Sequence, residues 1–328
     1  IDGLIGASGG PKWLILGRLD RVVISELLSG RSRPLDAIGS SIGSWRHAAM
    51  AQPDPIQAYD RFEQAYLTQN YTSAKPTVPE ITEVALWLMR TLLGEKGERH
   101  VAQHSWLRSH IVTARGRGFN GRQPGKRLIA GMGAAALGNA VSRGTLPASF
   151  QRVVFASSSA EPLTPLFDGF GTRYIDLADN NVFSALMASG AIPYVFEGVY
   201  DIEGAGKGAF WDGGIIDYHF DLTRLPEDKV WLYPHFNSRT TVGWFDKFLP
   251  WRADQQVSAD QLIMICPSDE FLAQLPFGKI PDRRDFGKIP ERVREAYWRY
   301  CVKESERLAD EFYELINGSD PLAGAIRL

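Results

Sequence analysis

The sequence is poor in cysteine and lacks the common metal-binding spacings. Its two cysteines, Cys266 in an apolar run and Cys301 in a helical pattern, look like buried thiols, so a disulfide framework is not expected. Neither C-x-x-C nor H-E-x-x-H occurs. The sequence therefore gives no support for a metal site, and we expect neither a metal nor a cofactor.

A surplus of charge of one sign is also lacking. The 36 Lys and Arg residues against 38 Asp and Glu residues give a net charge of -2, which provides no electrostatic reason to expect a nucleic-acid partner. Basic residues cluster mildly at 108–127. We interpret this cluster as a solvated loop; an anionic surface or head group is the less favoured interpretation.

Long apolar runs are absent as well. No stretch has the length of a membrane span, and the Gly/Ala-rich run at 128–141 is too short for one. We therefore expect a cytoplasmic protein. The chain begins at Ile1 and not at methionine, so upstream residues are expected to be missing, and secretion stays open as an alternative.

The remaining composition is that of a globular α/β protein. The chain has 328 residues, 44% hydrophobic and 23% charged, which suits one large α/β domain. Its first 50 residues read as strand, glycine turn and helix twice in succession, an order that predicts a parallel sheet with crossover helices. Further expected elements are strands at 152–157, 172–177, 209–211, 229–236 and 261–266, a helix at 181–190, a mainly helical insertion at about 53–147 with a capping box at Thr77 and Glu80, and a C-terminal helix at about 290–317.

A G-x-S-x-G pattern at Gly39–Gly43 raises the first candidate for chemistry. Ser41 follows an apolar strand and precedes a helix, and this strand-to-helix elbow exposes a serine hydroxyl beside free backbone N–H groups. Such a serine is a candidate nucleophile once a base accepts its proton. The alternative is a tight turn in which Ser40 or Ser41 caps the helix.

A second copy of the pattern surrounds Ser8. It continues into Gly9-Gly10-Pro11-Lys12, where consecutive glycines leave backbone N–H groups unshielded and proline begins a helix. This loop is better suited to receiving negative charge than to presenting a nucleophile. The alternative is a plain glycine turn.

Two kinds of residue are candidates for the base that accepts the Ser41 proton. Among the six histidines, His219 and His235 are the most plausible members of a catalytic triad. Asp212 is the other choice, because it directly follows the apolar strand at 209–211 and precedes two glycines that keep its approach open. An ordinary Asp-Gly turn is the alternative for Asp212.

Four separated segments together resemble the patatin-like phospholipases. Residues 8–13 (SGGPKW) match the family motif G-G-G-x-[KR]-G, Gly39–Gly43 matches its G-x-S-x-G motif, and Asp212–Gly214 matches D-G-[GA]. Residues 188–196 (ASGAIPYVF) are similar to the family's A-S-x-A-I-P-x-x-F segment. The resemblance covers residues 1 to about 55 and about 150 to 220.

The resemblance implies a three-layer α/β/α sandwich with a mainly parallel sheet and a serine acyl hydrolase that uses a Ser41–Asp212 dyad. Its substrates would be acyl esters or phospholipids, with transient contact to a membrane surface; the sequence indicates no oligomeric state. Because a carboxylate is a weak base at its usual pKa of about 4, we expect the apolar strand at 209–211 to raise the pKa of Asp212 by desolvation. The implied motif glycines are Gly39, Gly43, Gly213 and Gly214.

Two residues depart from the family's oxyanion motif. Ser8 replaces its first glycine and Trp13 its last; a side chain at Ser8 narrows the hole or adds a hydroxyl donor, and Trp13 is expected to pack at the mouth. Two other functions stay open: an ordinary α/β-hydrolase with a histidine base, and a lipid-binding or scaffold protein with little turnover. The residues implied for the oxyanion hole are Gly9, Gly10 and Ile42, through backbone N–H groups, together with Lys12.

Overall fold

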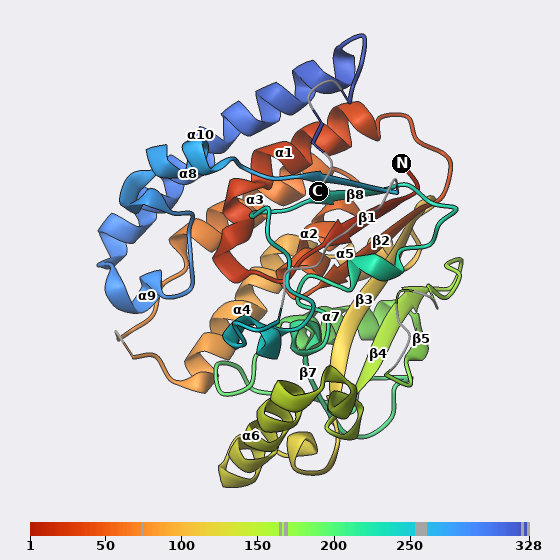
Figure 1. Ribbon diagram of the computed structural model, residues 1–328, viewed down its shortest axis with the longest axis vertical. Helices are drawn as coiled ribbons and strands as arrows, with labels where there is room; N and C mark the ends of the chain where they lie inside the picture. Colours follow the sequence, from red (N-terminus) through yellow and green to blue (C-terminus); the bar gives the residue numbers. More distant parts are fainter. Residues whose placement is uncertain (74, 164–165, 167–169, 253–260, 323–324, 327–328) are drawn as a thin grey trace.

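The computed structural model describes residues 1–328 except 74, 164–165, 167–169, 253–260, 323–324 and 327–328. Its described strands form one sheet in the order β5-β4-β3-β2-β1-β8-β9, with β7 and β6 joined to the side of β3 (Figure 1). Most neighbouring pairs are parallel, while β4, and likewise β7, run antiparallel to β3. The strands are β1 (Gly3–Gly6), β2 (Leu35–Ser40), β3 (Leu107–Gly116), β4 (Phe150–Ser157), β5 (Arg173–Leu177), β6 (Val199–Tyr200), β7 (Ala209–Asp212), β8 (Trp231–Pro234) and β9 (Leu262–Ile265).

Helices flank the sheet, so the predicted α/β class with a mostly parallel sheet is confirmed (Figure 1). The capping box of Thr77 and Glu80 begins α4, as the sequence predicts. The helix expected from Pro11 is instead three consecutive pieces: a 3-10 helix (η1, Gly10–Ile15), α1 and a π-helical turn (η2, Val23–Leu27). The α-helices are α1 (Gly17–Val22), α2 (Ile42–Met50), α3 (Pro55–Thr68), α4 (Val78–Leu93), α5 (Gly97–Ala102), α6 (Lys126–Val141), α7 (Asp179–Gly190), α8 (Asp269–Gln274), α9 (Asp285–Lys288) and α10 (Glu291–Asn317).

Strands β2 and β7 meet end to end along one side of β3. The parallel strand β2 pairs with the first half of β3, and its last residue, Ser40, lies opposite Val112. The antiparallel strand β7 pairs with the second half, and its last residue, Asp212, lies opposite Thr113. Because the two strands run toward each other, their carboxyl ends converge at neighbouring positions of β3. This convergence brings together segments far apart in the sequence.

Strand β3 lies in the middle of the sheet, which bears on the predictions for residues 108–127 and for the insertion at about 53–147. Residues 107–116 are a largely buried strand, so the solvated loop expected at 108–127 is wrong for its first half. Polar residues of β3 point inward with partners, and His110 Nε2 lies 3.0 Å from Asp36 Oδ1. The segment at 53–147 therefore supplies a middle strand of the sheet in addition to helices α3 to α6.

The main core packs the sheet against helices α1 to α5, α7 and α10. Trp13 is fully buried there and stacks on Phe62 at a centroid distance of 4.7 Å, so its expected position at the mouth of the site is wrong. Its indole ring is too large and apolar to remain in solvent when α3 offers an aromatic partner. Arg46 and Asp20 form a buried bidentate ion pair in the same core, with distances of 2.7 and 2.5 Å.

Candidate active site

Ser41 occupies a strained turn between β2 and α2. Its φ of 55° and ψ of -129° lie outside the regions that L-residues favour, a cost that the surrounding structure has to offset. The elbow depends on close backbone approach, because a Cβ on Gly43 would lie 1.9 Å from the Gly6 carbonyl oxygen. Glycine at position 43 therefore allows α2 to begin directly against β1.

Ser189 in α7 holds this turn in place. Its Oγ accepts a hydrogen bond from the Ser41 N–H at 2.9 Å and donates one to the Val112 carbonyl oxygen at 2.7 Å. Ser44 adds a bond from its hydroxyl to the Ser41 carbonyl oxygen at 2.7 Å. The sequence assigned no role to Ser189 itself, although it lies in the segment 188–196 that carried part of the resemblance.

The structure brings Ser41 and Asp212 into direct contact. Ser41 Oγ donates a hydrogen bond to Asp212 Oδ2 at 2.8 Å, and the Gly214 N–H donates to Oδ1 at 2.7 Å. Burial raises the pKa of Asp212 to about 6, against the lowering effects of these two hydrogen bonds and of the Arg283 and Lys247 charges. The carboxyl group thus titrates closer to neutral pH than an exposed aspartate.

The loop after β1 lies beside this pair and carries unengaged backbone donors. Among the described residues, the N–H groups of Gly9, Gly10 and Ile42 have no hydrogen-bond acceptor. Gly10 has a φ of 56°, a conformation that favours glycine. The Lys12 ammonium lies 4.7 Å from the centroid of the Phe236 ring, next to the same loop.

The Ser8 side chain is buried and already has a hydrogen-bond partner. Its Oγ lies 3.0 Å from Ser40 Oγ, and its N–H donates to the Tyr218 carbonyl oxygen at 2.9 Å. A Cβ on Gly214 would lie 2.5 Å from Ser8 Oγ, so the hydroxyl fills the space beside the D-G-G turn. The extra side chain at this position is therefore accommodated by the glycine opposite it.

Two basic side chains that the sequence analysis missed, Arg283 and Lys247, lie near the candidate active site. The Arg283 guanidinium covers Gly10, where a Cβ would lie 3.3 Å from Nη2. Lys247 Nζ donates to the Tyr218 hydroxyl at 3.2 Å, and burial together with the Lys12 and Arg283 charges lowers its pKa to about 8. Both residues lie outside the segments that carry the resemblance, and no local pattern marks them.

Neither candidate histidine base reaches Ser41. His219 Nδ1 accepts from the Thr241 N–H at 3.0 Å, and His235 Nδ1 faces the backbone of Asn237, against its carbonyl oxygen and 3.2 Å from its N–H. Burial lowers the pKa of His235 to about 3 and that of His219 well below its usual value. In the part of the chain that the structure describes, no hydrogen bond joins either imidazole to Ser41.

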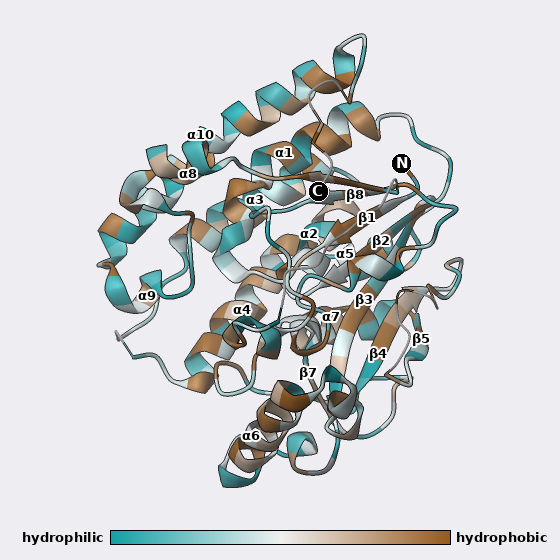
Figure 2. Cartoon of the chain, viewed as in Figure 1, coloured by the Kyte–Doolittle hydropathy of each residue, from teal (hydrophilic) through white to brown (hydrophobic). Residues whose placement is uncertain are grey.

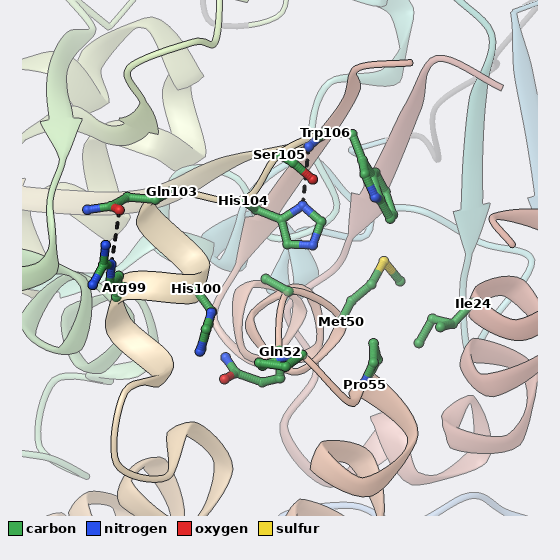
Figure 3. A pocket seen from close by; sticks show the side chains of 12 residues that line it. Ile24, Met50, Gln52, Pro55, Arg99, His100, Gln103, His104, Ser105 and Trp106 are labelled. Atoms are coloured by element: carbon green, nitrogen blue, oxygen red, sulfur yellow. Dashed lines mark hydrogen bonds between the residues drawn. The ribbon is translucent and has the colours of Figure 1, made fainter. Parts of the chain in front are cut away.

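A cavity of about 520 Å³ lies away from this site, at the far end of α2. Ser41 precedes the first turn of α2, whereas Met50 and Gln52, at its last turn, line the cavity together with His100 and His104. Figure 3 shows the His104 imidazole projecting toward Met50 and Gln52. The cavity is therefore a separate feature near the start of β3, at the end of α2 that lies away from Ser41.

The described residues contain neither a candidate metal site nor a candidate membrane span. No group of three or more His, Cys, Asp or Glu side chains there is arranged to hold a metal ion. Cys266 and Cys301 are free thiols. None of the helices in the described ranges combines the length and the apolar character that crossing a bilayer requires.

Comparison with known proteins places the chain in a family. The sequence profile described as patatin-like phospholipase matches residues 16–219, more than half of the chain. No curated protein matches it significantly. Among solved structures, the chain is similar to VipD from Legionella pneumophila, with 10% identity and a TM-score of 0.37 over 94% of this chain and 67% of that chain. It is also similar to a chain of the ExoU–SpcU complex from Pseudomonas aeruginosa, with 15% identity and a TM-score of 0.30 over 94% of this chain and 52% of that chain. On the strength of the profile match, the chain belongs to the patatin-like phospholipases, a family of lipid acyl hydrolases.

Proposed function

We propose that the protein is a serine esterase that cleaves acyl esters of lipids through a Ser41–Asp212 dyad. The observation that carries the proposal is the 2.8 Å hydrogen bond from Ser41 Oγ to Asp212 Oδ2, made by a serine on a strained strand-to-helix turn. A serine hydroxyl needs an adjacent base to become nucleophilic, and a carboxylate within hydrogen-bond distance is such a base.

The reaction begins as Asp212 Oδ2 accepts the Ser41 proton and Ser41 Oγ forms a bond to the ester carbonyl carbon. The negative charge that develops on the carbonyl oxygen is received by the backbone N–H groups of Gly9 and Gly10, with Ile42 as a further donor. The bond to the alcohol oxygen then breaks, and Asp212 returns the proton to the departing alcohol. A water molecule, deprotonated by the same carboxylate, hydrolyses the acyl-enzyme and regenerates both groups.

The raised pKa of Asp212 supports this role. At an ordinary pKa near 4, a carboxylate is too weak a base to accept a serine proton efficiently, whereas burial raises the pKa of Asp212 to about 6. Each oxyanion-hole donor contributes on the order of 3 kcal/mol to lowering the barrier. Lys12 and Arg283 add positive charge beside the loop that carries these donors.

Hydrolysis of p-nitrophenyl esters and labelling by a fluorophosphonate test the assignment. Wild-type protein is expected to turn over the esters and to be labelled at Ser41, whereas Ser41→Ala loses both and Asp212→Asn loses turnover. Ser8→Ala, which removes a hydroxyl engaged with Ser40, is expected to retain labelling. Labelling that persists in Ser41→Ala would end the assignment of the nucleophile.

The two other functions give different results in the same assays. A triad with a histidine base predicts that His219→Ala combined with His235→Ala abolishes turnover, whereas the dyad predicts retained turnover in a folded double variant. A lipid-binding or scaffold protein predicts that serine-directed phosphonates fail to label the wild-type chain. A panel of acyl esters of different chain lengths then defines the preferred substrate.

A further inference from the structure

Helix α6 has an apolar outward face. Ile129, Leu137 and Val141 are 60%, 74% and 86% exposed, whereas the polar side chain of Asn139 is fully buried. Between Arg127 and the end of the helix no charged residue occurs. Figure 2 shows α6 at one end of the molecule, largely in brown and pale colours. A helix in contact with water alone normally shows the reverse pattern.

The apolar face is bordered by positive charge. Arg122, Lys126 and Arg127 are exposed at the beginning of α6. Residues 99–160 contain nine Lys and Arg residues and no Asp or Glu, although the whole chain carries a net charge of -2. Four of the nine, Arg117, Arg122, Lys126 and Arg127, are exposed and lie just before α6 or in its first turn, whereas Arg152 is buried against Asp217. The combination of an apolar face with basic residues at its edge is typical of helices that lie in the interface of anionic bilayers.

Two aromatic side chains extend this region. Phe248 and Trp251 are 60% and 67% exposed, and they end or follow the 3-10 helix η7 (Trp244–Phe248), which packs against α6. Arg252 ties them to α6 by donating a hydrogen bond from Nη2 to the Asn139 carbonyl oxygen at 2.7 Å. Tryptophan in particular favours the boundary between lipid head groups and acyl chains.

The inner face of α6 is joined to the strand that carries Asp212. Leu128 and Ala135 share a small core with Trp211 and Ile215, the residues on either side of the Asp212–Gly214 turn. Trp211 Nε1 also donates to the Asn120 carbonyl oxygen at 2.7 Å, just before α6. The inner face of α6 is thus packed against the residues that flank the Asp212–Gly214 turn.

We propose that the α6 surface, defined as Ile129, Leu137 and Val141 with Arg122, Lys126 and Arg127, docks on lipid bilayers that contain anionic phospholipids. The apolar side chains enter the head-group boundary and the basic side chains contact lipid phosphates. This goes beyond the proposed function, because it concerns the surface on which the protein rests and not the bond that it cleaves. An anionic bilayer fits the α6 surface better than a second copy of the chain does, because two copies would bring their basic residues against each other.

Vesicle cosedimentation of the full chain carrying Ser41→Ala tests the proposal without any turnover. The protein is expected to bind vesicles of phosphatidylcholine mixed with phosphatidylglycerol, and to bind phosphatidylcholine vesicles at least about tenfold more weakly. Leu137→Glu combined with Val141→Glu should lower the partition coefficient by roughly tenfold or more, because the favourable transfer of two apolar side chains from water into the bilayer is lost. Arg122→Gln, Lys126→Gln and Arg127→Gln together should remove the preference for anionic vesicles.

Matched substitutions on α10 separate a local effect from a general one. Val293→Glu with Leu315→Glu changes two comparably apolar side chains that are 48% and 36% exposed. Lys288→Gln, Arg292→Gln and Lys303→Gln remove three exposed charges from α9 and α10. Both control sets are expected to bind like the parent. In chains that keep Ser41, unchanged urea-unfolding midpoints and unchanged hydrolysis of a short p-nitrophenyl ester would show that the α6 variants remain folded.

Three outcomes would overturn the proposal. The parent chain could fail to bind anionic vesicles, or the α10 variants could lose binding as much as the α6 variants do. Light scattering without lipid could also show a dimer that Leu137→Glu with Val141→Glu dissociates, which would identify a second copy of the chain as the occupant. A failure of the proposed esterase activity would appear separately, as absent turnover in a protein that still binds vesicles.

Discussion

Replacement of Asp212 by asparagine should stabilise the protein at pH 8 while abolishing its activity. In the folded protein, burial raises the pKa of Asp212 from 3.8 to about 6. Each pKa unit corresponds to about 1.4 kcal/mol, so holding the ionised carboxylate in the folded state costs about 3 kcal/mol at pH values above both pKa values. The same burial that makes the Asp212 carboxylate basic enough to accept the serine proton therefore destabilises the folded protein.

The sign of the pH dependence follows from the raised pKa. The folded state binds the proton more tightly than the unfolded state, so the stability associated with Asp212 is fully present below about pH 4 and is lost as the pH rises through about 6. The amide side chain introduced by Asp212→Asn would remain neutral at every pH, and its carbonyl oxygen would still accept the hydrogen bond from the Gly214 N–H. The gain from Asp212→Asn is therefore expected to grow with pH over this window.

Urea unfolding at pH 4 and at pH 8 measures the difference. Asp212→Asn should match the wild type within about 1 kcal/mol at pH 4 and exceed it by about 3 kcal/mol at pH 8. Asp20→Asn is the matched control, because Asp20 is equally buried but paired with Arg46, and its loss should destabilise the protein by about 3–5 kcal/mol. A gain in Asp212→Asn that is absent at pH 8, or equal at both pH values, would refute the reasoning.

Three further predictions concern the same site. The kcat/KM for a soluble ester should fall about tenfold per pH unit below pH 6, because the base must be ionised, and a limb near pH 4 would contradict this. Arg283→Ala should move that limb to higher pH, since the guanidinium charge lowers the pKa of Asp212, whereas the exposed Arg292→Ala should leave it unchanged. Ser189→Ala should lower the free energy of unfolding by about 1–3 kcal/mol in urea titrations, because the buried Ser41 N–H loses its acceptor; an unchanged midpoint would argue against that role.

The sequence predicts those parts of the fold whose hydrophobic pattern is strong. Strands β1, β2 and β4 and helix α2 follow apolar runs and glycine turns, and the structure has them where expected. Strand β7 extends the predicted strand at 209–211 by one residue, to Asp212. Strand β3 was not predicted because its buried positions include the polar residues His110 and Thr113, whose side chains find partners in distant segments, at Asp36 and Val153. A local pattern carries no information about such partners.

The residues of the candidate site were likewise predictable from the sequence only in part. Ser41 and Asp212 were identified because the elbow and the turn require glycines at fixed positions beside them, and these glycines are visible in the sequence. Arg283 and Lys247 were missed because a single cation in a turn or a short 3-10 helix gives the same local pattern whether it faces solvent or a catalytic loop. Only the path of the chain after β8 brings these two residues to Gly10 and Tyr218.

The end-to-end meeting of β2 and β7 makes the Ser41–Asp212 distance sensitive to the register of one short pairing. Strand β7 has four residues, of which Phe210, Trp211 and Asp212 pair with β3. A slip of two residues along β3 would displace the carboxylate by about 7 Å, and a slip of one would turn it to the other face of the sheet. Heat or denaturant should therefore inactivate the protein when β7 detaches from β3, before the rest of the sheet unfolds. The amide hydrogens of β7 should exchange with solvent at the rate at which activity is lost.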